Sequence, residues 1–137
     1  MWRDLAAELG LAVTDPASRA DVEAAEAACG CALPDVLREL LAETDGLGGS
    51  LVFSALEIAR VNREMRTTPD FAELYMPFDP LLIFGAEDNG DLFAFRVLAG
   101  AADPMDVFVW DHETDSRTST AFGLERYLRG ERWHAGD

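Results

Sequence analysis

Residues 81–110 read LLIFGAEDNGDLFAFRVLAGAADPMDVFVW and contain three short apolar runs separated by turn residues. The runs cover residues 81–84, 92–97 and 107–110. They are rich in β-branched and aromatic side chains, a composition typical of strands. Residues 88–91, with the sequence Asp-Asn-Gly-Asp, predict one hairpin turn, and residues 113–116 predict another before a weak last strand at 117–120. An antiparallel sheet explains this half of the chain best.

The first half of the chain has helical periodicity instead. In residues 33–41, apolar side chains recur at i, i+3, i+4, i+7 and i+8, which predicts an amphipathic helix. Earlier helices are expected over residues 2–9, ended by Gly10, and from a cap at Asp15-Pro16 or Ser18 to Cys29, ended by Gly30. The remaining pattern predicts a strand at 51–53, a helix at 55–66, helical turns at 71–76 and a helix around 124–128.

Together these patterns predict one α+β domain over residues 1–137. It has helices first, a mainly antiparallel sheet in its second half and a C-terminal helix. A chain of 137 residues is long enough to bury roughly 68–70% of the surface that its unfolded form exposes. Because 49% of the residues are hydrophobic, the chain carries enough apolar material to fold alone.

The charge balance limits the partners of this domain. Eleven basic and 26 acidic residues give a formal net charge of −15, and all the positive side chains are arginine. Such a chain repels the phosphates of nucleic acid and an anionic membrane surface, so neither is an expected partner. A basic protein is favoured as a partner, although an acidic surface also serves solubility alone.

Few residues offer catalytic or metal-binding chemistry. Cys29 and Cys31 are separated by one residue, where a mutual disulfide would be strained, so we expect reduced thiols. The two histidines, His112 and His134, lie far from them in sequence, and neither a metal nor a cofactor is expected. Asp111-His112-Glu113 resembles an acid/base group, but neighbours in a strand point to opposite faces. We therefore expect no enzymatic activity.

The first residues and the apolar runs indicate the cellular compartment of the protein. Residues 1–4 lack a basic region followed by an apolar stretch. No apolar run approaches the ~18 residues of a membrane helix. Read as written, the sequence predicts a cytoplasmic protein.

The order of these segments resembles the SMI1/KNR4 family, also called the SUKH superfamily of small α+β domains, over about residues 18–129. The resemblance is carried by the Leu-Pro step at 33–34 before the amphipathic helix, by Asp45-Gly46, where the family often has Asn-Gly, and by Ile58 and Asn62. It continues through GDLFAF at 90–95, VFVWDHE at 107–113 and the closing helix at 124–128. The Gly48-Gly49 loop and the lack of lysine depart from the family pattern.

The resemblance implies a non-catalytic binding domain. Bacterial members are commonly immunity proteins that bind and block a cognate toxin, often a nuclease or deaminase, whereas fungal relatives look like regulatory adaptors. An adaptor for an endogenous partner is therefore the alternative, and a small hydrolase built on His112 or Cys31 is a third hypothesis. The oligomeric state stays open.

Acidic residues near the expected turns are the candidate contacts for a basic partner. Two hairpin ends could present their carboxylates side by side on one rim. Residues 88–91 lack the spaced acidic positions of a calcium-binding EF-hand loop. The candidate partner-binding residues are Asp45, Glu87, Asp88, Asp91, Asp111, Glu113 and Asp115.

Overall fold

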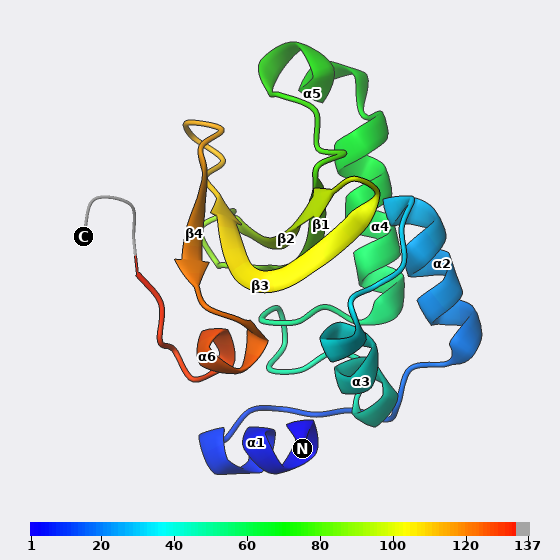
Figure 1. Cartoon of the computed structure of the whole chain (residues 1–137), viewed down its shortest axis with the longest axis vertical. Coiled ribbons are helices and arrows are strands. Elements are labelled where there is room, and N and C mark those ends of the chain that lie inside the picture. Colours follow the sequence, from blue (N-terminus) through cyan, green and yellow to red (C-terminus); the bar gives the residue numbers. More distant parts are fainter. Residues whose placement is uncertain (134–137) are drawn as a thin grey trace.

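The computed structural model describes residues 1–133, and Figure 1 shows how its helices surround one curved sheet. The helices before the sheet are α1 (Trp2–Leu9), α2 (Arg19–Cys29), α3 (Asp35–Glu43), α4 (Ala55–Thr67) and α5 (Pro69–Leu74). The strands are β1 (Leu81–Ala86), β2 (Leu92–Leu98), β3 (Ala101–Trp110) and β4 (Arg117–Ala121), and α6 (Leu124–Leu128) follows them. The predicted α+β class and element order are confirmed. Within residues 1–133, no helix is long and apolar enough to cross a membrane.

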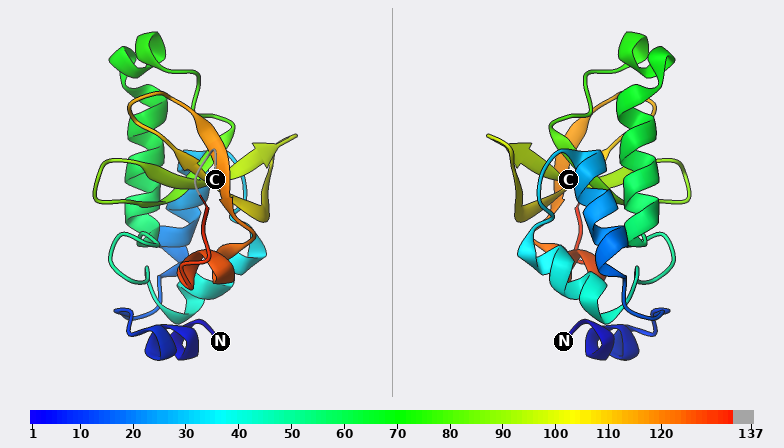
Figure 2. Two further views of the ribbon diagram at one scale, coloured as in Figure 1. Left: turned by 90° about the vertical axis from the view of Figure 1, so that its left-hand side faces the viewer. Right: turned by 90° about the vertical axis from the view of Figure 1, so that its right-hand side faces the viewer.

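The helix boundaries follow the predicted caps. Gly10 and Gly30 end α1 and α2 in the left-handed region, both with φ of 70°. The Ser18 hydroxyl accepts a hydrogen bond from the Asp21 amide, so Ser18 caps α2 rather than Asp15-Pro16. Ser54 caps α4 in the same way. Figure 2 shows α2 lying alongside α4, which places α4 between α2 and the sheet.

The four strands form an antiparallel sheet in the order β1-β2-β3-β4. The two predicted hairpin turns are present between β1 and β2 and between β3 and β4. The predicted third strand is too short, because β3 already begins at Ala101 after a tight turn at Ala99 and Gly100, with φ of 51° and 79°. Pro104 hid this extension; it lies where the pairing of β2 with β3 shifts register, so its missing N–H is tolerated.

The predicted strand at 51–53 is wrong. The strand-type pairing of this segment is limited to an isolated bridge between Val52 and Leu47, and both side chains are buried. Its apolar residues are core residues of a loop, and a short apolar run does not distinguish that case from a strand.

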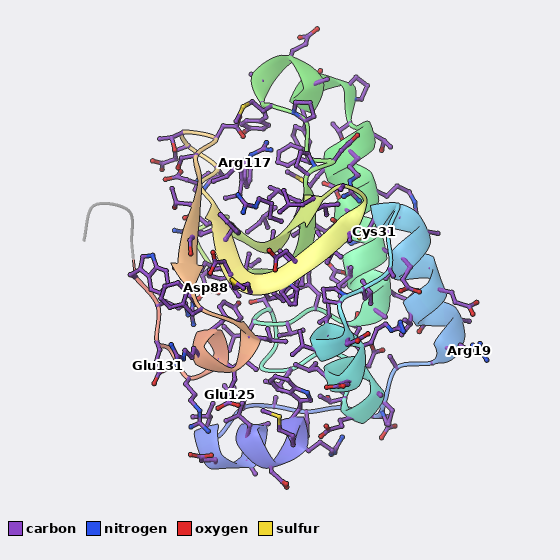
Figure 3. The ribbon with its side chains drawn as sticks, viewed as in Figure 1. Arg19, Cys31, Asp88, Arg117, Glu125 and Glu131 are labelled. Atoms are coloured by element: carbon purple, nitrogen blue, oxygen red, sulfur yellow. The ribbon has the colours of Figure 1, made fainter. Side chains whose placement is uncertain are left out.

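Aromatic side chains cover both faces of the sheet. On one face, the Tyr127 ring of α6 packs edge-on against Phe84 and Phe93, with centroids 5.5 and 4.8 Å away. On the concave face, Trp110 packs against Tyr75 and Phe78, with centroids 5.1 and 5.3 Å away. Figure 3 shows Arg117 on this side, inside the curve of the sheet.

The outer edge of β1 is covered by the segment from Ser50 to Arg66. The Asn62 amide of α4 accepts from the Ile83 N–H at 3.0 Å and donates to the Ile83 carbonyl at 2.8 Å. Arg66 donates to the Leu81 carbonyl at 2.7 Å. The loop before α4 adds hydrogen bonds from Phe53 N to Phe84 O and from Ala86 N to Ser50 O. A Cβ at position 85 would lie 2.2 Å from the Leu51 oxygen, so this close approach requires Gly85.

Candidate partner-binding surface

The β1–β2 and β3–β4 turns meet at one end of the sheet, because Leu92 pairs with Trp110. A carboxylate oxygen of Asp91 lies 2.7 Å from the His112 Nδ1 atom and accepts the His112 amide at 3.2 Å. The His112 ring also lies close to the Gly90 backbone, where a Cβ would stand 3.5 Å from it. These contacts hold the two turns together as one rim.

Beside this rim, the sheet surface is hollowed to a volume of about 460 Å³. Phe93, Val109 and Thr118 lie on its floor, and the register of the strands places them on one face, opposite the concave face. The carboxylates of Glu87, Asp91 and Asp111 line the same hollow. The rim and the hollow therefore form one acidic surface.

Arg132 is the basic side chain that lines this hollow. Its guanidinium lies 4.7 Å from the centroid of Tyr127 and 5.2 Å from that of Phe93, and its Nη1 atom is 3.5 Å from Glu87 Oε1. Sequence reasoning missed Arg132, because a single arginine after the last helix carries no local signal. Stacking on two rings and pairing with Glu87 hold Arg132 against the sheet.

Six of the seven candidate residues lie on the two turns, all except Asp45. Glu87 is partly buried against Arg132, whereas Asp88 and Glu113 are exposed. Asp111 and Asp91 lie close together, and the Asp111 carboxylate accepts the amides of Glu113 and Thr114. A role in partner binding for these residues stays a prediction.

Asp45 and Asp115 make contacts that stabilise the fold. Asp45 lies outside the rim, after α3, and its carboxylate accepts the Ala55 amide at the start of α4 at 2.8 Å. Asp115 accepts hydrogen bonds from the Trp110 indole at 2.7 Å, the Met76 amide at 2.9 Å and Arg117 at 3.1 Å. Burial opposes ionisation of Asp115, but these donors outweigh it and lower its pKa.

The geometry at His112 corrects one expectation. β3 ends at Trp110, so residues 111–113 belong to a turn and the alternation of a strand does not apply to them. As a result, His112, Asp91 and Asp111 do come together, with one potential ligand atom from each within 4.8 Å of the others. The hydrogen bond with Asp91 raises the pKa of His112. The same bond engages Nδ1, so it makes a turn junction rather than an open metal site.

The groups that a hydrolase would need are engaged elsewhere. In the described residues, the Ser116 hydroxyl accepts a hydrogen bond from Thr114, and no hydrogen bond joins it to His112. Cys29 and Cys31 are free thiols; burial raises the pKa of Cys29 to about 11 and also raises that of Cys31. Both thiols are therefore held in the protonated, weakly nucleophilic form. His134 lies outside the described residues.

Comparison with protein families gives a match to the SMI1 / KNR4 family (SUKH-1) over residues 16–130. The chain belongs to this family. The match agrees with the resemblance in the sequence and covers α2 through α6, together with both turns of the acidic rim. A search of the curated proteins finds no match.

The SMI1/KNR4 match places two features of this chain outside the family region. α1, which buries Trp2, precedes residue 16, and Arg132 follows residue 130. The family includes immunity proteins and is generally non-catalytic. Membership therefore agrees with a binding function for the acidic surface and names no partner.

Proposed function

We propose that this SMI1/KNR4 domain is an immunity protein, which binds a basic toxin domain and blocks it by covering its active site. A toxin that acts on nucleic acid needs a basic cleft to attract phosphates. An acidic inhibitor complements such a cleft, and long-range attraction speeds its association. Family membership and the net charge of −15 both support this function.

The observation that carries the proposal is the acidic rim of the two turns. Asp88, Asp111 and Glu113 stand on it, and no arginine forms an ion pair with them within residues 1–133. Because Asp88 and Glu113 are exposed, arginine or lysine side chains of a partner can reach them without disturbing the fold. Binding of a basic surface would neutralise repulsion that the free protein tolerates.

The first experiment asks whether the chain binds and neutralises the product of the gene next to its own. The two proteins are copurified, the complex is titrated with salt, and cell growth is measured with and without the chain. We expect a one-to-one complex that weakens as salt rises and that abolishes toxicity. No binding and no protection, with recovery of a housekeeping protein, would instead support the adaptor alternative.

A matched pair of double variants tests the surface. Asp88→Asn with Glu113→Gln removes two charges from the rim, and Glu39→Gln with Glu73→Gln removes two exposed charges from α3 and α5. Both variants carry the same net charge. We expect the rim variant to weaken binding by about three- to tenfold, mainly through slower association, and the control to stay within about twofold. Equal weakening would mean that net charge alone attracts the partner.

A further inference from the structure

β4 pairs with β3 along its inner side. One hydrogen bond shows which backbone groups of β4 point toward β3. The Asp111 amide donates to the Ser116 carbonyl at 2.9 Å at the start of this ladder. In an antiparallel pair, hydrogen-bonded and non-hydrogen-bonded residues alternate. Thr118, which pairs with Val109, therefore points its N–H and C=O toward β3. The backbone groups of Arg117 and Ser119 point to the outer side.

These outer groups have no partner within residues 1–133. Within these residues, Trp133 makes two hydrogen bonds to this edge: its amide donates to the Thr120 carbonyl at 2.8 Å, and its carbonyl accepts from the Thr120 hydroxyl at 2.6 Å. Outside the ladder with β3, no hydrogen bond from residues 1–133 reaches the backbone N–H or C=O of Arg117 or Ser119. Within residues 1–133, β4 is thus an open edge over these positions, and Figure 2 (left) views the sheet from this side. Such an edge is a template for another strand.

The side chains beside this edge select what can pair with it. Thr118 and Thr120 line the acidic hollow, together with Glu87, Asp91 and Asp111. A strand added to β4 projects every second side chain over that hollow. Three carboxylates face one arginine there, so basic side chains fit these positions.

We propose that the outer edge of β4 takes an extended segment of a basic protein as a fifth, antiparallel strand, with arginine or lysine at alternate positions over the hollow. The inference deepens the proposed function and rests on it for the basic character of the partner. Antiparallel pairing follows the rest of the sheet. A second copy of the chain is a poor occupant, because two copies with net charges of −15 repel each other.

The register gives a sharp test with a synthetic peptide. In the acetylated and amidated peptide Thr-Arg-Thr-Arg-Thr-Arg, arginine side chains over the hollow stand opposite Thr118, so their amides point away from β4. The threonine amides then face the edge. N-methylation of the threonines should abolish binding, whereas N-methylation of the arginines should leave it. The two peptides carry the same number of methyl groups and the same charge.

Binding is followed by amide chemical shifts and hydrogen exchange in the labelled full chain. We expect saturable shifts at residues 117–120 and slower exchange of the Arg117 and Ser119 amides. Ser119→Pro removes one outward N–H while leaving the inner ladder intact, so it should lose most of the binding, and Ser119→Ala should keep it. If Ser119→Pro does not fold, the pair of methylated peptides still decides the matter.

Several outcomes overturn the inference. They are absence of binding, equal binding of both methylated peptides, or shifts confined to other surfaces. Peptide binding that needs removal of residues 134–137 would assign the edge to the chain's own C-terminus. If, without peptide, hydrogen exchange of the Arg117 and Ser119 amides slows as the protein concentration rises, the β4 edge would be assigned to a second copy of the chain.

The peptide assay is separate from the test of the proposed function. If the neighbouring gene product binds and protects cells but the peptide does not bind the edge, the immunity function stands and the strand addition fails. If the peptide binds as expected and that gene product does not, the strand addition stands and the immunity function fails.

Discussion

The two outer edges of the sheet are treated in opposite ways. Along β1, the backbone groups of Leu81, Ile83, Phe84 and Ala86 all have partners from the segment between Ser50 and Arg66. Along β4, the outer-edge backbone contact made within residues 1–133 is that of Trp133 with Thr120. In the part of the chain that the structure describes, the β1 edge is covered and the β4 edge is open at Arg117 and Ser119.

The composition of the edges explains the difference. β1 is buried from Leu81 to Gly85, and a buried backbone group without a partner costs about 1–3 kcal/mol. It therefore needs a side chain such as Asn62, which substitutes for a neighbouring strand. β4 reads RTSTA, and its polar residues let water serve the open groups until a partner arrives. Changes at the β1 edge should reduce stability, and changes at the β4 edge should affect binding instead.

Asn62→Leu should have the largest effect on folding. The substitution leaves the N–H and C=O of Ile83 buried without partners, since Asn62 is 1% exposed and bonds to both. We expect a loss of about 3 kcal/mol in the free energy of unfolding, measured by urea denaturation. Arg63→Ala, on the exposed side of the same helix, should change it by less than about 0.5 kcal/mol. A loss below about 1 kcal/mol for Asn62→Leu would show that the β1 edge does not depend on this amide.

Asp115→Asn should be the next most damaging change. It removes the charge that accepts hydrogen bonds from Trp110, Met76 and Arg117, while asparagine still tolerates the φ of 60° at this position. Hydrogen bonds to a charged group suggest a loss of about 1–2 kcal/mol. Glu113→Gln in the same turn, at an exposed position, is the control. Similar stability of the two variants would mean that other contacts hold the β3–β4 turn in place.

Much of this fold could be predicted from local patterns. The spacing of Leu37, Leu40 and Leu41 predicts α3, and the glycines after α1 and α2 predict where those helices end. The two turns of the acidic rim follow from their Asp, Asn, Gly and Ser residues. These signals are local because they depend on the conformational preferences of a few adjacent residues.

The contacts that distinguish the two edges could not be predicted in this way. The bond from Met76 to Asp115 joins residues 39 apart, and that between Asn62 and Ile83 joins residues 21 apart. No periodicity encodes such pairs, so Asp115 resembled an exposed contact although it is a structural clamp. β3 ends at Trp110, one residue before Asp111, and this is why His112 lies in a turn and can approach Asp91. Composition defines the ends of strands poorly, so this position could not be predicted.

The ion pair between Asp91 and His112 should make a smaller contribution to the free energy of unfolding, and this contribution should depend on pH. The pKa of His112 is raised, mainly by its hydrogen bond with Asp91 and also by the charges of Glu113 and Asp111, so its contribution is full below about pH 6.5 and fades as pH rises through the raised value. Burial opposes ionisation of Asp91, but its hydrogen bonds with His112 and Asn89 outweigh it and lower the pKa. The contribution of Asp91 is full above about pH 3.8 and is lost on further acidification.

The urea midpoint of the protein, measured from pH 5 to 9, should therefore fall as His112 loses its proton. His112→Gln should remove this part of the pH dependence, and the urea midpoints of the variant and the parent chain should converge at high pH. An unchanged slope in the variant would show that the two turns are held together without the ion pair. The edge of β1 contains no titrating group of this kind, so Asn62→Leu should shift the whole curve evenly.

Ser119→Ala should have the smallest effect on folding. The Ser119 hydroxyl is buried and has no hydrogen-bond partner among residues 1–133, so its removal loses no hydrogen bond there and relieves a small desolvation cost. We expect the free energy of unfolding to stay the same or to rise by less than about 1 kcal/mol. The comparison with Asn62→Leu is direct, because each residue lies at one outer edge of the same sheet. A clear loss of stability in Ser119→Ala would mean that the buried hydroxyl makes a stabilising contact in the free protein, and the backbone edge itself is tested by Ser119→Pro.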